Sequence, residues 1–461
     1  MSILKFKGET AKEAVNIWKL WKRNLFRFLF IFLLFFIVPI DWKFYRQLFS
    51  IDWTNLQFYH LLSLARYQPA FFPLIDEEGV PVLGIASYAN WLLGIGVALI
   101  GGTIWAMLDR KREEYTVLYY WLWLLVRYRL AIALLSYGFY KLFVQQIPYP
   151  SLSNLFTNYG DFYAWKIYFQ TTGISPIYVS FLGFVEIFAA LLILNRKTVT
   201  WGAGLVIGFL GNVAAANGFY DIGELSFSTL LVIFSVFLFA QDVPRLYNLL
   251  IKEKLAKANT RVPDYGDKTL VRLRMAAKLV VGVLVVLFAY TAYSSWSSGF
   301  GSYKLPQQAG LPGAAGFYKV NSFIINRDTL PYAAQDSTRW QDVIFEKWST
   351  LSIKVNKPVQ IDRTSADEWQ EKDIDRNYEL AGFSGRHYYH YDIDAVNHKL
   401  HLQNKNRHHR KEKLSLTYLQ PNDSTLVLTG VNASNDSIKV ALQRINKPYM
   451  LFEGRRKAAR L

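Results

Sequence analysis

Long apolar runs separated by polar connections occupy the first 300 residues of the chain. A helix needs about 20 predominantly apolar residues to cross a membrane. Runs close to that length lie at 25–42, 84–107, 115–144, 174–194, 199–217, 225–240 and 279–296. The pattern predicts a polytopic α-helical membrane protein with about seven transmembrane helices. Gly94, Gly96, Gly101 and Gly102 in the second run are small enough to let another helix approach closely.

The third run is longer than one span requires, at a rise of about 1.5 Å per residue. Two arrangements fit it. Either 117–126 lies along the membrane interface and the span begins near Arg129, or one tilted helix places Arg127 and Arg129 inside the bilayer. The first arrangement is favoured, because both arginines then reach lipid headgroups.

A different pattern follows Gly301, where apolar and polar residues alternate. Period-two pairs occur at Leu400/Leu402, Leu414/Leu416, Leu426/Leu428 and Ile438/Val440, with turn-forming Asn, Asp and Pro between them. Segments 317–325 and 351–355 provide earlier strands. This pattern predicts an antiparallel all-β soluble domain, a small lipocalin-like barrel of about seven or eight strands.

Charge places these parts on two sides of the membrane. Lys and Arg concentrate in 1–24, at 110–112 and in 242–278, and basic residues beside spans mark the cytoplasmic side. The expected organisation is a basic amphipathic segment (1–24), an accessory region with two spans, an outer loop and the interfacial stretch (25–126), a four-helix core (127–242), a basic cytoplasmic linker (243–278), a seventh span (279–299) and an extracytoplasmic β-domain (300–461).

The composition of the chain limits the kinds of partner and cofactor that it can bind. The chain has 461 residues, 52% of them hydrophobic, and a formal charge of +17. Because the apolar runs argue against a soluble nucleic-acid binder, the natural counter-charge is anionic membrane lipid. The chain contains no cysteine, so disulfides and thiolate metal sites are excluded. The predicted spans contain no histidine, so bis-histidine haem would have no ligands there.

Polar side chains within or beside the spans are the candidate functional residues, since such groups are costly at that depth. They are Lys141, Asp161, Glu186, Asn212, Asn217, Tyr220, Asp221 and Glu224. All lie near the outer ends of their spans or in the adjoining loop, except Glu186, which is about 12 Å from the inner end of its helix. The purely structural interpretation of the outer group is an ion pair between Lys141 and Asp221.

The C-terminal histidines form another candidate cluster: His387, His390, His398, His401, His408 and His409. A separation of three residues along a strand points two side chains to opposite faces. We therefore expect solvated surface histidines and no metal site.

Several motifs carry a resemblance to a known family. Arg127-Tyr128-Arg129-Leu130-Ala131 with 137–143, and Gly183-Phe184-Val185-Glu186, are similar to the first two core helices of the DoxX-like family of bacterial membrane proteins. The Asn212, Asn217 and Tyr220-Asp221 pattern resembles a larger subgroup with extra N-terminal spans and a C-terminal β-domain. The resemblance covers most of residues 110–461 and implies a bacterial inner membrane, a cytoplasmic N-terminus and a periplasmic β-domain. Glu224 stands where the subgroup more usually has lysine, which reverses a charge at the helix end.

Three functions follow as expectations. The favoured one is a structural, assembly or accessory subunit of a cell-envelope complex, without catalysis of its own, whose β-domain binds a protein partner. The alternative is a quinone- or lipid-binding, redox-associated protein with a pocket at the outer side of the core, where donors such as Lys141 and Tyr220 would meet a quinone carbonyl. The third is a proton-coupled transporter using Glu186. No cofactor is expected unless the pocket holds a quinone or lipid.

Overall fold

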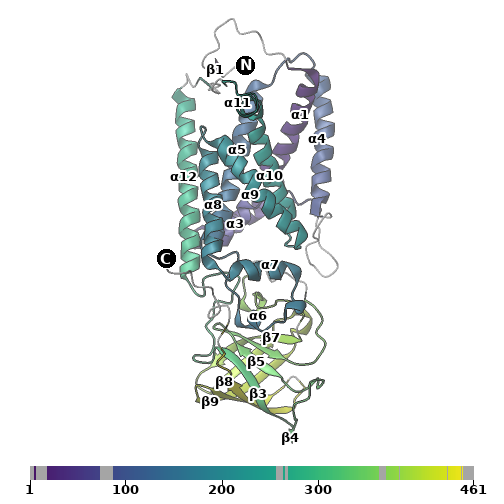
Figure 1. The fold of residues 1–461 in the computed structure, drawn as a ribbon, viewed down its shortest axis with the longest axis vertical. Helices are drawn as coiled ribbons and strands as arrows, with labels where there is room; N and C mark the ends of the chain where they lie inside the picture. The colour runs from purple at the N-terminus through teal and green to yellow at the C-terminus, as the bar shows by residue number, and fades with distance from the viewer. Residues whose placement is uncertain are drawn as a thin grey trace. The chain divides into compact units, whose positions relative to one another are not determined.

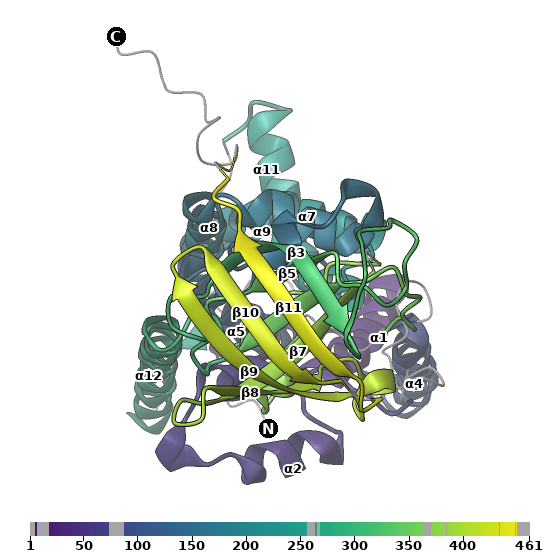
Figure 2. The same ribbon diagram turned by 90° about the horizontal axis from the view of Figure 1, so that it is seen from below.

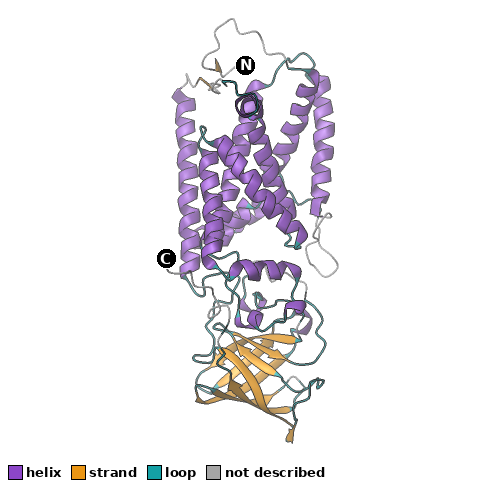
Figure 3. Cartoon of the chain, in the orientation of Figure 1, coloured by secondary structure: helices purple, strands orange, loops and turns teal. Residues whose placement is uncertain are grey.

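The computed structural model describes residues 5–6, 18–72, 87–255, 263–264, 268–362, 370–383, 385–432, 434–447 and 449. Six helical stretches in these residues are long and apolar enough to cross a membrane: Leu20–Ser50, Ala89–Leu108, Thr116–Leu142, Pro176–Leu194, Val199–Phe219 and Met275–Ser297. A seventh arises if Leu225–Ala240 and Val243–Leu250, bent by 63°, count as one span. The chain is thus a multi-pass membrane protein with a separate all-β part (Figure 3).

The chain divides into two compact units. The helical unit comprises Met1–Asp76, Pro81–Leu142 and Phe181–Tyr293, and the barrel unit comprises Glu77–Val80, Phe143–Ser180 and Ser294–Leu461. The helical elements between Met1 and Leu142 are α1 (Leu20–Ile37), α2 (Trp42–Ser50), η1 (Trp53–Asn55), α3 (Phe58–Ala65), α4 (Ala89–Leu108) and α5 (Thr116–Leu142). The later ones are α8 (Pro176–Leu194), α9 (Val199–Phe219), α10 (Leu225–Ala240), α11 (Val243–Leu250) and α12 (Lys268–Ser297), with a two-residue pairing of β1 (Lys5–Phe6) and β2 (Pro263–Asp264).

Within the helical unit, α1 packs along α4, α9 along α10, and α5 contacts α1, α3 and α10 (Figure 1). The α1–α4 contact confirms the role predicted for the glycines of α4. A Cβ at Gly94 would lie 3.0 Å from Phe35, and one at Gly102 would lie 3.5 Å from the Phe28 backbone, whereas Gly96 faces open space. A Cβ at Gly101 would likewise meet Ile31 of α1. Three of the four glycines therefore allow the close approach of α1 and α4.

Helix α5 corrects the favoured interpretation of the third run. Residues 116–142 form one continuous helix, so 117–126 is part of the span and not a separate interfacial stretch. The two arginines need not reach headgroups because they find partners inside the unit. Arg129 donates to the carbonyl of Ala65, the last residue of α3, at 2.9 Å and to that of Tyr67 at 2.8 Å. Arg127 is buried and donates to the Leu194 carbonyl at 3.3 Å.

The barrel unit contains a closed antiparallel barrel of eight strands. They are β3 (Gly316–Ile325), β5 (Asp342–Phe345), β6 (Thr350–Lys354), β7 (Arg386–Asp394), β8 (Lys399–Asn404), β9 (Lys413–Asn422), β10 (Thr425–Val431) and β11 (Ser437–Arg444), with the short β4 (Asp328–Thr329) beside β3. Each strand pairs with the next, and β11 closes the barrel on β3 with Val440 opposite Phe323. Figure 2 shows β9, β10 and β11 side by side.

The barrel interior is filled by large side chains. Inward positions of successive strands carry Phe345, Leu351, Tyr391 and Leu402, all at most 2% exposed, within one continuous apolar cluster. Alternation puts polar residues on the outer face of β8 and β9, as the burial of every second residue there shows. The barrel thus has a packed core, in contrast to barrels that enclose a ligand.

The segment 143–180 lies within the expected four-helix core (127–242) in the sequence, but it belongs to a different compact unit. It forms α6 (Leu152–Leu155), η3 (Tyr159–Asp161) and α7 (Ala164–Gly173), and it belongs to the barrel unit. Phe162 bridges Gly382, where a Cβ would collide with the Asp161 carbonyl, and Lys166 donates to the Tyr378 carbonyl at 2.6 Å. We call 143–180 the docked segment.

Candidate functional site

Close helix packing positions the buried charges of the helical unit. Gly138 on α5 faces Gly183 on α8, and a Cβ at Gly183 would collide with the backbone of Leu142. Two glycines at this crossing let the backbones approach, so Lys141 and Glu186 lie opposite each other. Their Nζ and Oε1 atoms are 2.8 Å apart, and both side chains are buried.

This ion pair differs from the one expected between Lys141 and Asp221. The partner of Lys141 is Glu186 and not Asp221, and the depth that was expected to separate Glu186 from Lys141 does not do so. Asp221 follows α9 in a left-handed conformation with φ of 54°, and it is exposed. The long lysine side chain reaches inward from the end of α5, which a count of residues from the helix ends does not reveal.

The other predicted residues lie in separate places. Asn217 is buried and donates to Ser228 on α10 at 3.1 Å, whereas Asn212 and Tyr220 are exposed. Asp161 belongs to the docked segment, where its carboxylate accepts from Asn158 at 3.0 Å. The set expected to line one pocket is therefore divided among several local contacts.

Glu224 has its own partners. Its carboxylate lies 2.9 Å from the Arg66 guanidinium and accepts from the Tyr137 hydroxyl at 3.0 Å. A lysine at this position would face Arg66 and repel it. The acidic residue thus suits the arginine that ends α3.

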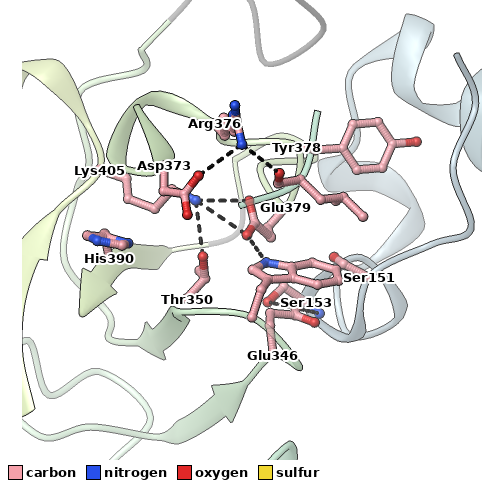
Figure 4. Close-up of polar contacts among 12 residues, drawn as sticks. Ser151, Ser153, Glu346, Thr350, Asp373, Arg376, Tyr378, Glu379, His390 and Lys405 are labelled. Atoms are coloured by element: carbon pink, nitrogen blue, oxygen red, sulfur yellow. Dashed lines mark hydrogen bonds and ion pairs between the residues drawn. The ribbon is translucent and has the colours of Figure 1, made fainter. Parts of the chain in front are cut away.

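A buried polar cluster that no sequence pattern indicated lies in the barrel unit. Figure 4 shows it between the docked segment and the strands β5, β6 and β7. Glu346, directly after β5, accepts hydrogen bonds from the backbone N–H of Leu152 at 3.1 Å and of Ser153 at 2.7 Å. The Ser153 hydroxyl donates to the same carboxylate at 2.7 Å and lies 3.0 Å from the Ser352 hydroxyl. The carboxylate thereby binds the first turn of α6.

A second carboxylate completes the cluster. The Lys405 ammonium lies 3.1 Å from Glu379 Oε2 and donates to the Thr350 hydroxyl, also at 3.1 Å, and Figure 4 shows it between these two residues. Glu379 also accepts from the Trp348 indole, and its backbone carbonyl accepts from Asn154 of the docked segment at 2.7 Å. We call Ser153, Asn154, Glu346, Glu379 and Lys405, with their contacts, the docking cluster.

The cluster holds more acid than base. Lys405 forms an ion pair with Glu379 and interacts electrostatically with Glu346, and the exposed fractions of residues Glu346, Glu379 and Lys405 are 2%, 0% and 2%. Burial, and next the charge of Glu379, raise the pKa of Glu346 to about 7 despite the hydrogen bonds from Ser153 and Leu152. Burial also lowers the pKa of Lys405, which Glu379 opposes. Glu346 is therefore the group that takes up a proton near neutral pH.

The chemistry open to this cluster follows from its burial. The carboxylates of the cluster are already held by the docked segment and by Lys405, so the cluster is suited to holding that segment and binding a proton. Among the residues that the structure describes, no three His, Asp or Glu side chains are grouped as metal ligands.

The histidines of the barrel unit correct one more expectation. His387 is only 7% exposed and His390 is half-buried, so neither is a solvated surface residue. Both lie on β7, where a separation of three residues places their side chains on opposite faces, and His390 Nδ1 lies 3.1 Å from the Ser349 hydroxyl. His398 and His401 are exposed as expected.

Comparisons with known proteins give one partial match. No protein-family model matches the chain. It is 30% identical over 92 residues to the uncharacterised protein YwoB of Bacillus subtilis (strain 168), a match that covers 20% of this chain. The chain spans 57% of that relative's length. No solved structure matches.

Proposed function

We propose that the protein is an accessory or assembly subunit of a cell-envelope complex in the bacterial inner membrane. The helical unit is the anchor, and the barrel unit, on the periplasmic side, is the module that binds a protein partner. The resemblance to DoxX-like proteins and the basic segments 110–112 and 242–278 support this placement.

The observation that carries the proposal is the incorporation of the docked segment into the barrel unit. This segment lies between two membrane helices in the sequence, and the docking cluster fastens it to strands more than 190 residues away, with Ser153 and Glu346 separated by 193 positions. The described chain therefore passes between the two units at 142/143, 180/181 and 293/294. A merely tethered domain needs one such connection.

The filled barrel favours a protein partner over a small molecule carried inside. Recognition is left to the surface, and the outer faces of β8, β9 and β11 present exposed lysines. Lys399 pairs with Thr417, and Lys439 pairs with Thr429, on adjoining strands. Lys413 adds a third exposed cation to the same face. We call this the lysine face; it suits an acidic protein surface.

Charge reversal tests the proposal. The full-length protein is purified in mild detergent after cross-linking in cells, and stoichiometric partners are identified by mass spectrometry. We expect the double substitution Lys399→Glu and Lys439→Glu to reduce recovery of the partner at least tenfold. Lys347→Glu, an exposed lysine outside this face, is the matched control and should change nothing. A protein that purifies without any stoichiometric partner, or a partner recovered equally with both variants, would refute the proposal.

A second candidate function rests on Glu186. Its Oε2 atom is buried and has no hydrogen-bond partner among the described residues. A quinol hydroxyl or a lipid headgroup donor would satisfy this oxygen, and a protonated Glu186 would instead donate to a quinone carbonyl. This function predicts a quinone or lipid that co-purifies with the protein and is lost in Glu186→Gln. Extraction and mass spectrometry would decide it, and an unchanged set of extracted molecules would reject it.

A further inference from the structure

Helix α11 contains no buried residue. It begins at Val243, after α10 has ended at Ala240, and the chain bends by 63° between the two helices. Figure 1 shows α11 almost end-on beside the upright helices of its unit, and Figure 2 shows it extending outward from them. Helix α11 therefore runs sideways from the helical bundle and leaves its side chains open to the surroundings.

The start of α11 lies at the edge of the membrane-spanning region. Helix α10 packs along α9, and the Thr200 hydroxyl, in the first turn of α9, donates to the carboxylate of Asp242 directly before α11. Val199–Phe219 is long and apolar enough to cross a membrane, so its first turn lies near one headgroup layer. Eight residues make a helix of about 12 Å, which after a bend of 63° advances only about 5 Å further along the axis of α10. Helix α11 thus stays near that layer.

The side chains of α11 divide into an apolar face and a basic face. The helical hydrogen bonding extends to Lys252, whose N–H donates to the Tyr247 carbonyl at 3.2 Å. Arg245 and Lys252 are seven residues apart and so lie on the same side. The opposite side carries one apolar stripe at helical spacing, formed by Val243, Leu246, Tyr247, Leu250 and Ile251.

The apolar stripe is exposed enough to need a cover. Leu250 and Ile251 are 68% and 69% exposed, and Leu246, the least exposed residue of the stripe, is half-buried. A continuous apolar face of this kind marks contact with a membrane or with another protein.

The charges around α11 favour a membrane as the cover. Exposed cations surround it, and one of them lies in the turn between α8 and α9: Lys197, Arg245, Lys252 and Lys254. The acidic residues beside them are Asp242, which already accepts from Thr200, and the exposed Glu253. Helices with an apolar stripe and a basic opposite face lie in the headgroup layer, where the cations attract anionic lipid.

We propose that α11 lies flat in the headgroup layer of one leaflet and binds anionic phospholipid. Its apolar stripe enters the acyl boundary, and Arg245, Lys252 and Lys254 reach the phosphates. This lipid-binding surface belongs to the helical unit and is separate from the lysine face, so it does not depend on the protein having a partner.

The depth of the stripe is measured on single thiols, since the chain has no cysteine. Leu250→Cys on the stripe and Asn248→Cys on the other side each receive a nitroxide spin label. The full-length protein is reconstituted into nanodiscs of phosphatidylcholine and phosphatidylglycerol. In power-saturation EPR, we expect the label at position 250 to be more accessible to oxygen than to a water-soluble nickel chelate. The label at position 248 should show the reverse preference.

The lipid class is measured at the same position. A bimane fluorophore on Leu250→Cys is quenched by lipids with brominated acyl chains, and only phosphatidylglycerol or only phosphatidylcholine carries the bromine. The ratio of the two quenching signals gives the local composition. We expect about threefold enrichment of phosphatidylglycerol around α11, because each basic residue near the surface attracts anionic lipid.

Charge reversal identifies the residues responsible. Arg245→Glu with Lys252→Glu should bring the local composition to that of the whole bilayer. Lys347→Glu with Lys357→Glu changes the net charge equally at two exposed positions of the barrel unit. This pair is the matched control and should keep the enrichment.

Three results would overturn the proposal. A label at position 250 that prefers the nickel chelate would place the stripe in water. A label protected from both reagents would show that a second copy or another protein covers it. Equal enrichment of phosphatidylglycerol in the charge-reversal variant and its control would show that α11 does not recognise anionic lipid.

Discussion

Glu346 is the residue whose proton has the widest effect, because its carboxylate binds the docked segment from inside the barrel unit. Its pKa of about 7 lies above the ordinary value of 4.5, and burial is the main cause. The folded state therefore holds this proton more tightly than the unfolded state between those two pH values. Linkage then makes the folded state lose stability as pH rises through that window.

The first prediction concerns this pH dependence. The contribution of the Glu346 proton is fully present below pH 4.5 and is lost above pH 7, a change of about 3 kcal/mol. Glu346→Gln should flatten the decline, because the amide does not titrate and its oxygen still accepts from Ser153. Denaturant unfolding from pH 4.5 to 8, followed by hydrogen exchange of the strand amides of the barrel unit, measures it. An unchanged slope in the variant would show that another group titrates.

Other ionisable groups lie near Glu346, so the control substitution must be a carboxylate outside this set. Glu379, Lys405, Tyr388, Tyr391 and Tyr449 interact with it electrostatically. The tyrosine pKa values are raised by burial, so these groups stay neutral across the window. Asp392→Asn, an exposed carboxylate on β7, is the matched control and should keep the slope of the native protein.

The second prediction concerns Lys405 and Glu379, a pair with no exposed side-chain surface. Lys405→Met leaves Glu379 buried without its cation and should destabilise the barrel unit by about 3–5 kcal/mol. Lys405→Met combined with Glu379→Gln removes both charges and should recover more than half of that loss. A double-mutant cycle of unfolding free energies measures it, and simple additivity of the two changes would contradict the ion pair.

At the scale of elements, the crossing of α5 and α8 depends on two glycines. It aligns Lys141 with Glu186, and no side chain separates the two backbones there. The positions of these helices were predictable from apolar runs, because a membrane-spanning pattern is local in the sequence. Their close crossing and the ion pair were not, because these depend on which helix lies opposite.

The third prediction follows from this crossing. Gly183→Ala places a methyl group against the Leu142 backbone, and overpacking of this kind costs about 1–3 kcal/mol. We expect a lower unfolding temperature in detergent. Gly208→Ala on α9 is the matched control, since no atom lies within 4 Å of its Cβ position. Equal unfolding temperatures for the two variants would contradict the close crossing.

The strands could likewise be predicted where the pattern depends on neighbouring residues, and they were missed where it depends on distant parts of the chain. β8 to β11 were predictable because one face is buried and the other exposed, which produces alternation. β5 and β7 were missed. All four residues of β5 are buried, because its outer face is covered as well, so alternation disappears. The docking cluster was missed for a related reason: Asn154 meets Glu379 across 225 positions, and neither neighbourhood carries a motif.

For the whole molecule, the orientation in the membrane is the property most open to a direct test. The fourth prediction uses the absence of cysteine, which makes every introduced thiol unique. Lys399→Cys on β8 should react with a membrane-impermeant maleimide once the outer membrane is permeabilised. Lys252→Cys, after α11, should react only when the inner membrane is also broken. Labelling of both under the first condition, or of Lys252→Cys alone, would reverse or refute the proposed topology.

The docked segment also determines when the barrel unit can be completed. Residues 143–180 leave the ribosome before most of α8 and before α9 to α12, and the strands that bury them come last. Contacts between residues so far apart in the sequence form slowly, since a long loop must close first. Until β5, β6 and the loop bearing Glu379 arrive, Ser153 and Asn154 have no barrel to bind. A ribosome that stops after α12 therefore releases a membrane protein that has its transmembrane helices and yet exposes an incomplete interface, which makes it a substrate for chaperones and proteases.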